Sequence, residues 1–388
     1  MQPPRTLQYV DRPGIIDLGW GHPMPSALPV DAWRASQEEA LREYSWQALT
    51  YGYEAGPGPL VEWLCERLGE TDPRAPAPDE VFVTAGASQG IELVSTVLTR
   101  PGDAVVVDSP TYHLALRILA DRDVELIGAP ADDDGIDPHA TGALLRRLHR
   151  ASRRVPLLYL VPTFANPTGR SLPDPRRREL VEVARDTGTT IVEDDTYREL
   201  AYDGPAPPSL WSIDPAGGVV RLGSFAKSVG PGLRLGWLTA TPAFVRTLTR
   251  RGFVDSGGGL NHATALAMAV MGRSGRFAGH VEAIRTRYRA QRDALVAALR
   301  TELPALVVTP PHGGWFLWLR LPDGMSATAL LAAAERHGVS FLPGNRFYAQ
   351  PAGDDRLRLS YSMVEPAALA EAARRLRAAF TTPATRYR

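Results

Sequence analysis

The chain has 388 residues, of which 44% are hydrophobic and 22% are charged, the composition of an ordinary globular protein. Its 43 basic and 43 acidic residues give a formal net charge of zero, which argues against a nucleic-acid surface as the main function. One cysteine, Cys65, excludes an internal disulfide, and no Cys/His cluster has zinc-ligand spacing. Without a signal peptide or a membrane-length apolar run, the sequence predicts a cytoplasmic protein of two or three domains.

Secondary structure is predicted from the hydrophobic pattern along the chain. The proline-rich first 40 residues predict an extended arm, and a short helix follows at 33–44. From residue 80 onward, short β-rich runs alternate with helical stretches. Strands are predicted at 81–84, 104–108, 157–161, 190–193, 219–222 and 236–238, with helices at 88–98, 112–120 and from 174. Because the runs are continuously apolar, these strands are expected to be covered on both faces of a mostly parallel α/β sheet.

A change of pattern near residue 280 predicts a second, smaller α+β unit. It comprises a long arginine-rich helix at 277–300, strands at 315–321 and 356–360, and helices at 327–336 and 366–380. The predicted organisation is therefore an N-terminal arm that is also part of the small domain (1–40), a large domain (41–280), and a small C-terminal domain with its connecting helix (281–388).

Lys227 is the only lysine in the chain, and every other one of the 43 basic residues is arginine. A guanidinium stays protonated in proteins, so arginine cannot replace lysine where a neutral amine must attack a carbonyl. Lys227 lies in a small, Gly-rich loop after the apolar run 219–223, which suggests a nucleophile that forms an imine. Taken alone, chance survival of one lysine under a coding bias toward arginine explains it equally well.

Four further segments have chemistry suited to a site. Gly86–Gln89 separates a predicted strand from a helix start, so it is either an anion site or a plain turn with a serine N-cap. Asn166–Gly169 is turn-forming, and Glu193–Tyr197 closes a buried strand with carboxylates. Arg356–Ser360 alternates charge with leucine, which places both arginines on one face, as an exposed surface strand also would.

Three of these segments follow the C-terminal ends of different predicted strands, and the fourth contributes a second cation. Open α/β sheets bind ligands at the edge formed by the C-terminal ends of their strands. Together they supply a phosphate cradle, an amine, a carboxylate, an amide and a phenol. That set of groups fits one cofactor, pyridoxal 5′-phosphate, which needs a lysine for its imine and an acid for its ring nitrogen.

From about Ile16 to Phe380 the chain resembles the fold-type I pyridoxal-phosphate enzymes, specifically class I/II aminotransferases of the aminoadipate/kynurenine aminotransferase-like branch. The motifs that carry the resemblance are Ser224-x-x-Lys227 followed by Arg234, then Asp194–Tyr197, and Asn166–Gly169. The resemblance implies a large domain whose mostly parallel central sheet is sandwiched by helices, and a smaller α+β C-terminal domain. It also implies a homodimer with shared active sites.

The resemblance assigns the reacting parts of the site residue by residue. Lys227 forms the imine with the cofactor, and Asp194 pairs with the protonated ring nitrogen. Asn166 and Tyr197 hydrogen-bond the ring's 3′ oxygen, while Tyr112 stacks on the ring face and is counted with the catalytic residues.

The same resemblance assigns the binding residues. The phosphate is expected to be held by Ala87, Ser88, Gln89, Ser224 and Arg234, with Tyr51 reaching it from the neighbouring subunit. Arg358 is expected to clamp the substrate α-carboxylate bidentately, as its planar fork suits. Further candidates for substrate binding are Asn166, Gly21 and Trp20.

The expected reaction is transfer of an amino group between an L-amino acid and a 2-oxo acid in two half-reactions, with Lys227 moving the α-proton. A lyase, decarboxylase or oxidase reuses the same carbanion, and the motifs do not separate these reactions. A cofactor-binding sensor without turnover is a further alternative. Substrate identity stays open, with Trp20, His22, Tyr53 and Arg346 as candidates for side-chain recognition. With no room for a DNA-binding domain, a regulator is not expected.

Overall fold

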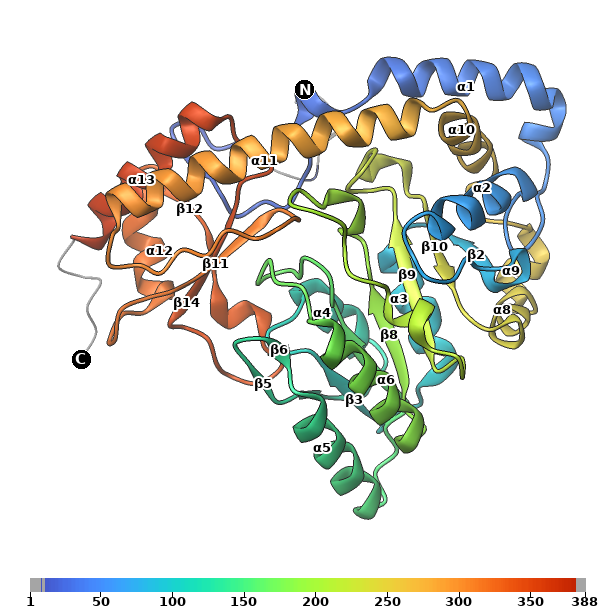
Figure 1. Ribbon diagram of the computed structural model, residues 1–388, viewed down its shortest axis with the longest axis horizontal. Coiled ribbons are helices and arrows are strands. Elements are labelled where there is room, and N and C mark those ends of the chain that lie inside the picture. Colours follow the sequence, from blue (N-terminus) through green and yellow to red (C-terminus); the bar gives the residue numbers. More distant parts are fainter. Residues whose placement is uncertain (1–7, 9–10, 382–388) are drawn as a thin grey trace, which may run out of the picture.

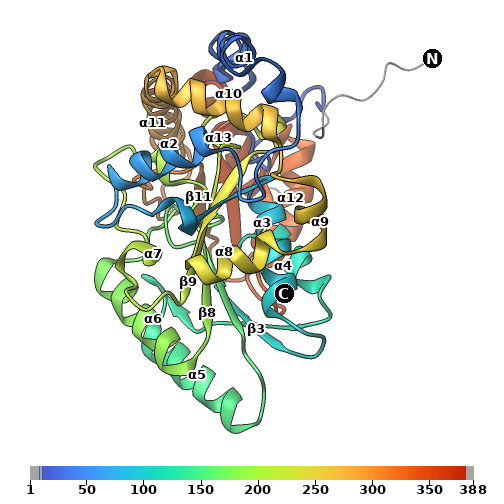
Figure 2. The same cartoon turned by 90° about the vertical axis from the view of Figure 1, so that its right-hand side faces the viewer.

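A computed structural model describes residue 8 and residues 11–381 of the chain. A seven-stranded sheet lies between two layers of helices, and a smaller C-terminal layer with its own sheet packs beside it (Figure 1). The view turned by 90° shows the helix layers on opposite faces of the central strands (Figure 2). The mostly parallel α/β sheet and the small α+β unit predicted from the sequence are confirmed.

The central sheet has the strand order β2-β10-β9-β8-β7-β3-β4. Its strands are β2 (Val81–Thr84), β3 (Ala104–Val107), β4 (Glu125–Gly128), β7 (Leu157–Leu160), β8 (Thr190–Asp194), β9 (Val219–Ser224) and β10 (Gly236–Thr239). Most of these residues are fully buried, as continuous Val/Leu runs predict. The edge strand β4 escaped prediction because it begins with an exposed glutamate and is only partly buried.

Strand direction brings the candidate residues to one edge of the sheet. β10 is antiparallel to both β2 and β9, and the remaining pairs are parallel. Because two reversals cancel, β2 runs in the same direction as β9. The C-terminal ends of β2, β3, β7, β8 and β9 therefore lie on the same edge, where parallel sheets hold their ligands.

Two apolar clusters cover the two faces of this sheet. One face packs against α3 (Ala87–Leu98), α4 (His113–Ala120), α8 (Pro242–Thr249) and α9 (Gly252–Gly257). The other packs against α5 (Pro138–Arg150), α6 (Asp174–Thr187) and α7 (Leu210–Ile213). The short hairpin of β5 (Ala131–Asp132) and β6 (Gly135–Ile136) precedes α5. A third cluster joins α2 (Gly58–Gly69) and α10 (His262–Arg273) to β2 and β10.

The C-terminal layer begins with the long helix α11 (Arg276–Glu302), which crosses the top of the molecule in Figure 1. Its sheet has the order β11-β14-β13, from β11 (Phe316–Arg320), β13 (Leu342–Pro343) and β14 (Arg356–Ser360). Helices α12 (Ala327–Arg336) and α13 (Pro366–Phe380) pack in the same cluster. The arm joins this layer, because its strand β1 (Ile16–Asp17) pairs in parallel with β12 (Val339–Ser340).

Helix α11 contributes to two apolar clusters. Phe277 and Val281 belong to the cluster of α2 and α10, while residues from Ile284 onward belong to the C-terminal cluster. We propose that the boundary between the two domains passes through α11 near residue 281, because the helix changes packing partners there. After the arm, α1 (Val30–Tyr44) packs on α10, and its start three residues before the predicted one reflects an uninterrupted helical run from Val30.

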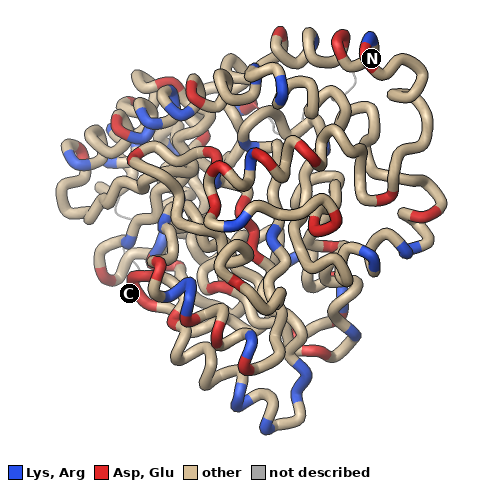
Figure 3. Tube along the Cα trace, turned by 45° about the vertical axis from the view of Figure 1, so that its right-hand side comes forward, with Lys and Arg blue, Asp and Glu red and all other residues tan. Residues whose placement is uncertain are grey.

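Charge is spread over the whole molecule rather than gathered by sign. In the Cα trace, blue and red segments are scattered over most of the molecule, between longer tan stretches (Figure 3). Within residues 11–381 no helix is both long enough and apolar enough to span a bilayer. Among the same residues, no group of three His, Cys, Asp or Glu side chains is arranged to hold a metal ion.

Candidate active site

The predicted site residues meet between the central sheet and the C-terminal sheet. Asp194 ends β8, Lys227 lies in the loop after β9, and Asn166 lies in the loop after β7. Arg358 comes from β14, and its Nη1 donates a hydrogen bond of 2.7 Å to Asn166 Oδ1. A residue of the small layer thus contacts a residue at the edge of the large sheet, although 192 positions separate them in the chain.

The amine of Lys227 lies close to aromatic rings and to a main-chain carbonyl. Its Nζ donates to the carbonyl of Gly21 at 3.2 Å and lies 4.9 Å from the ring centroid of Trp315. Burial lowers the pKa of Lys227 from 10.5 to about 8, against the opposing charge of Asp194, and the charges of Arg358 and Arg234 lower it further. An amine so placed is more readily neutral near physiological pH than an exposed lysine.

The two carboxylate oxygens of Asp194 differ in their partners. Oδ2 accepts a 2.8 Å hydrogen bond from the hydroxyl of Tyr159, and Oδ1 is buried without a hydrogen-bond partner. Burial raises the pKa of Asp194, while hydrogen bonds from Tyr159 and Thr196 act in the opposite direction. A buried carboxylate oxygen lacking a donor is suited to receive one from a ligand.

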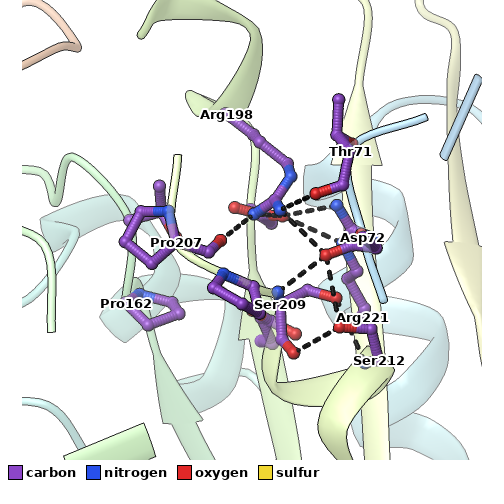
Figure 4. Close-up of polar contacts among 12 residues, drawn as sticks. Thr71, Asp72, Pro162, Arg198, Pro207, Ser209, Ser212 and Arg221 are labelled. Carbon is purple, nitrogen blue, oxygen red and sulfur yellow. Dashed lines mark hydrogen bonds and ion pairs between the residues drawn. The ribbon is translucent and has the colours of Figure 1, made fainter. Parts of the chain in front are cut away.

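Asp195 belongs to a buried ion-pair network, of which Figure 4 shows Asp72, Arg198 and Arg221. Arg221 contacts Asp195 Oδ2 through Nη2 at 2.7 Å and contacts Asp72 Oδ2 through Nη1 at the same distance. Asp72 Oδ1 in turn accepts from Arg198 Nη2 at 2.8 Å and from the N–H of Ser209 at 2.8 Å. Burial alone would raise the pKa of Asp72, but these two arginines hold it below its usual value.

Glu193, the other neighbour of Asp194, is hydrogen-bonded at both oxygens. The two oxygens of Glu193 accept the main-chain N–H groups of Leu210 and Trp211 at 3.0 Å each, at the start of α7. Glu193 is therefore held by main-chain donors at both oxygens, and Asp195 is ion-paired to Arg221 through Oδ2, although Asp195 Oδ1, like Asp194 Oδ1, is buried without a hydrogen-bond partner. The sequence Glu193-Asp194-Asp195 alone did not distinguish the three acids.

The first turn of α3 forms an uncapped helix N-terminus at the same edge. Its N-cap is Gly86 with φ +89°, and no side chain caps it, so the alternative of a serine N-cap is wrong. A Cβ at Gly86 would lie 3.0 Å from Arg234 Nη2, so only glycine lets this guanidinium come so close. Free N–H groups beside an arginine form an anion site.

The remaining predicted phosphate residues surround that turn. Ser88 and Arg234 are exposed, and Arg234 Nη2 donates to the carbonyl of Ala85 at 3.0 Å. Gln89 Oε1 accepts the N–H of Ala85 at 3.2 Å, and Ser224 Oγ accepts the N–H of Ala226 at 3.1 Å. Ala87 is the first residue of α3. The predicted anion site is thus assembled from β2, α3 and the loop after β9.

Arg358 is 2% exposed, which excludes the alternative of a surface strand with an outward charged face. Its guanidinium carbon lies 4.2 Å from the ring centroid of Phe316 and 5.0 Å from that of Phe347. Nη2 donates to the carbonyl of Gly19 at 2.5 Å, and Nε is buried without a partner. Burial lowers the pKa of Arg358 to about 10. The guanidinium therefore packs against two aromatic rings, and its Nε has no protein partner and can donate to a carboxylate.

Two tyrosines complete the site. Tyr112 is the N-cap residue of α4, and burial, aided by the charge of Asp194, raises its pKa to about 12. Tyr197 is 4% exposed, and burial also raises its pKa, although a hydrogen bond from Asn166 opposes this. Both phenols stay protonated at neutral pH and act there as hydrogen-bond donors or as ring surfaces.

The arm contributes its main chain more directly than its side chains. The carbonyls of Gly19 and Gly21 accept from Arg358 and Lys227, and Trp20 packs edge-on against His22 with ring centroids 5.3 Å apart. A Cβ at Gly21 would lie 2.8 Å from Phe316, so glycine is required for this close approach. Burial, together with the charge of Lys227, lowers the pKa of His22.

Three predicted residues do not join the site within one chain. Tyr51 and Tyr53 are 83% and 77% exposed, and Arg346 is exposed as well. Conversely, sequence reasoning overlooked Tyr159 and Trp315. A tyrosine inside the otherwise aliphatic strand 157–161 was a usable signal, because a buried hydroxyl needs a partner. Nothing in the local sequence pointed Trp315 toward Lys227.

This structure fits pyridoxal phosphate at two separate points. The unpartnered Oδ1 of Asp194 matches a protonated ring nitrogen, and the uncapped start of α3 beside Arg234 matches a phosphate. A mostly parallel sheet that presents these groups with a buried lysine at its C-terminal edge defines a pyridoxal-phosphate enzyme of fold type I.

Comparison with known proteins narrows this class. Residues 13–376 match the family model "Aminotransferase class I and II", and the chain belongs to this family. The 2-aminoadipate transaminase of Thermus thermophilus is 34% identical, with 95% of this chain and 91% of that protein covered. Aromatic-amino-acid aminotransferase 1 of Thermococcus litoralis is 32% identical, covering 95% of this chain and 89% of that protein.

A solved structure gives the same answer. The kynurenine aminotransferase of Pyrococcus horikoshii, solved with pyridoxamine phosphate (PMP), superposes with a TM-score of 0.87 at 32% identity, over 94% of this chain and 90% of that one. The protein is a pyridoxal-phosphate-dependent aminotransferase that acts on an amino acid and a 2-oxo acid. The expectations for fold, cofactor and reaction class are confirmed, and transamination is chosen over the alternative lyase, decarboxylase, oxidase and sensor.

Proposed function

We propose that Lys227 is the residue that binds the cofactor covalently and moves the substrate α-proton, with Asp194 and Arg358 as its partners. The observation that carries this assignment is the meeting of one partly buried amine with one buried carboxylate and one buried guanidinium. Each charge is costly to bury, and Asp194 Oδ1 and Arg358 Nε are buried without the hydrogen-bond partners that a purely structural role would supply.

Each residue has a separate task in this proposal. Arg358 binds the α-carboxylate and orients the amino acid, while Asn166, hydrogen-bonded to Arg358, keeps the guanidinium in place. The uncapped turn of α3 and Arg234 bind the phosphate. Pyridoxal phosphate, when bound, supplies an electron sink for the electron pair left when the α-proton departs.

Proton transfer falls to Lys227. Its lowered pKa leaves a useful neutral fraction near pH 7 to 8, which can accept the α-proton, and the resulting ammonium can return it at a neighbouring carbon. Asp194 accepts a hydrogen bond at the ring nitrogen through its free Oδ1. The rings of Trp315 and Tyr197 lie 4.9 Å and 5.7 Å from the amine and limit its contact with water.

The assignment is tested by reduction and by substitution. Since Lys227 is the only lysine, borohydride treatment of the cofactor-saturated protein should leave one pyridoxyl-modified lysine peptide in the mass spectrum. Lys227→Ala should abolish turnover, and its cofactor-free form should still unfold cooperatively. An unmodified peptide at position 227, or retained transamination in the variant, contradicts the proposal.

We further propose a homodimer in which Tyr51 acts on the partner's cofactor. Segment 46–53 exposes four large apolar side chains, Trp46, Leu49, Tyr51 and Tyr53, each more than 70% accessible. Adjacent exposed aromatics of this size mark an interaction surface. The segment lies near the candidate phosphate site. Gly259, in the loop before α10, donates to the carbonyl of Gly52 at 3.4 Å, and just after the segment the carbonyl of Ala55 accepts from the N–H of Val83 in β2, the strand that precedes the phosphate turn.

Two experiments test the dimer. Leu49→Asp should shift the protein from dimer to monomer in sedimentation, whereas Val307→Asp, at an apolar residue exposed in the C-terminal part, should not. Mixing Lys227→Ala chains with Tyr51→Phe chains should restore one intact site per mixed dimer if Tyr51 acts across the interface. Activity that never exceeds that of the Tyr51→Phe chains alone contradicts the shared site.

A further inference from the structure

Tyr159 lies on the strand next to that of Asp194. It belongs to β7, next to β8, and the register pairs it with Val192. Its side chain is fully buried, and its hydroxyl donates to Asp194 Oδ2 at 2.8 Å. The surrounding residues of β7 are leucines, so the strand places a single polar group against the acid.

This contact makes the two oxygens of Asp194 unequal. Oδ2 is engaged by Tyr159, and Oδ1 is left without a partner. A carboxylate held at one oxygen loses freedom to rotate, so the other oxygen keeps one direction. Hydrogen bonds to a carboxylate also stabilise its charged form, and here the bond from Tyr159 offsets the effect of burial on Asp194.

The donor itself does not change state. Burial raises the pKa of Tyr159 well above its ordinary value, and the charge of Asp194 acts in the same direction. The phenol therefore remains a donor throughout the pH range in which such an enzyme works. The side chains of glutamine and serine are shorter, whereas the phenol carries its oxygen about 6.5 Å from Cα.

We propose that Tyr159 is a positioning residue of the aminotransferase: it holds Asp194 ionised and turned so that Oδ1 faces the cofactor's ring nitrogen. This inference rests on the proposed role of Asp194. Tyr159 touches neither the substrate nor the cofactor in this assignment and acts through Asp194 alone. The competing explanation is that Tyr159 only fills the core and satisfies its own hydroxyl.

The two explanations differ in what Tyr159→Phe does at the cofactor. We expect kcat to fall on the order of 10- to 100-fold, the range that corresponds to loss of one hydrogen bond to a charged group. KM for the amino acid should stay within about twofold, because Arg358 is untouched. A core-filling role predicts a loss of stability with kcat unchanged.

A spectroscopic readout separates positioning from stability. Cofactor-free protein is reconstituted with pyridoxal phosphate labelled with ¹⁵N in the ring, and the ¹⁵N chemical shift reports whether that nitrogen is protonated. In wild type the nitrogen should be protonated, and in Tyr159→Phe the signal should move toward the unprotonated position. Tyr361→Phe is the matched control, because it removes an equally buried hydroxyl that donates to the carbonyl of Gly314 at 2.9 Å.

Asp194→Asn distinguishes failure of this inference from failure of the assignment beneath it. If Asp194→Asn leaves the ring nitrogen protonated, the role of Asp194 is wrong, and the role of Tyr159 with it. If Asp194→Asn moves the ¹⁵N signal but Tyr159→Phe behaves like Tyr361→Phe, only the proposal for Tyr159 is overturned. Should Tyr159→Phe fail to fold, a fluorotyrosine at position 159 keeps the shape and alters donor strength, and an unmoved ¹⁵N signal there also overturns it.

Discussion

Burial of the Lys227 amine should cost the cofactor-free protein stability at neutral pH. Its pKa is lowered from 10.5 to about 8, a difference of 2.5. At 1.36 kcal/mol for each pKa unit, the folded state disfavours the ammonium by about 3 kcal/mol. Part of the side chain still reaches solvent, so we expect about 2 kcal/mol in practice.

The sign of the effect follows from proton counting. Between pH 8 and 10.5 the unfolded chain holds a proton on Lys227 that the folded chain has released. Stability therefore rises with pH through this window and carries the full cost below it. Lys227→Met, which keeps most of the length of the side chain and removes its charge, should be more stable than wild type at pH 7 by about 2 kcal/mol.

Urea unfolding of the cofactor-free wild type and Lys227→Met at pH 7 and at pH 10 measures this difference in the free energy of unfolding. All other titrating groups are shared, so the difference between variant and wild type isolates Lys227. The advantage of Lys227→Met should shrink as pH rises from 7 to 10. A variant less stable than wild type at pH 7, or an advantage independent of pH, refutes the reasoning. As a direct check, the pH dependence of acylation at the only lysine should report a pKa near 8.

Three further predictions concern binding and packing. Arg358→Lys keeps the charge but loses the planar fork, so kcat/KM should fall about 10- to 100-fold, mainly through KM, in steady-state assays. Asp72→Asn leaves Arg221 with one carboxylate partner in place of two and should cost about 3 to 5 kcal/mol in urea unfolding. Gly223→Ala puts a Cβ 2.1 Å from the Trp237 ring and should lower stability by about 1 to 3 kcal/mol; an unchanged midpoint contradicts the packing.

The regular elements were largely predictable because each follows from a local pattern. Strands 81–84 and 356–360 and helices 327–336 and 366–380 have the predicted bounds, since their apolar periodicity ends where turn residues begin. The edge strand 125–128 was missed because an edge strand needs no continuous apolar run. The antiparallel direction of 236–239 also left no local signal, because strand direction depends on the connection rather than on the strand.

For the site, the sequence named candidates without locating them. Lys227 was conspicuous as the only lysine, and Arg358 as one of two arginines on an alternating strand. Which acids of Glu193-Asp194-Asp195 are held by structural partners was a different matter. That choice depends on Arg221 and on the start of α7, which reach the triplet from elsewhere in the chain. Tyr159 escaped notice for the same reason, because its partner lies on the next strand.

Residue pattern by itself determined that this chain builds an α/β layer with one amine, one anion turn and several acids near strand ends. Local propensity and periodicity act over a few residues, and they suffice for that. Tertiary structure alone decided which of these groups lie together in one site and which are held by structural ion pairs and hydrogen bonds. Burial, hydrogen bonding and charge pairing arise between segments that are more than a hundred residues apart, as Arg358 and Asn166 are, and no local stretch encodes them.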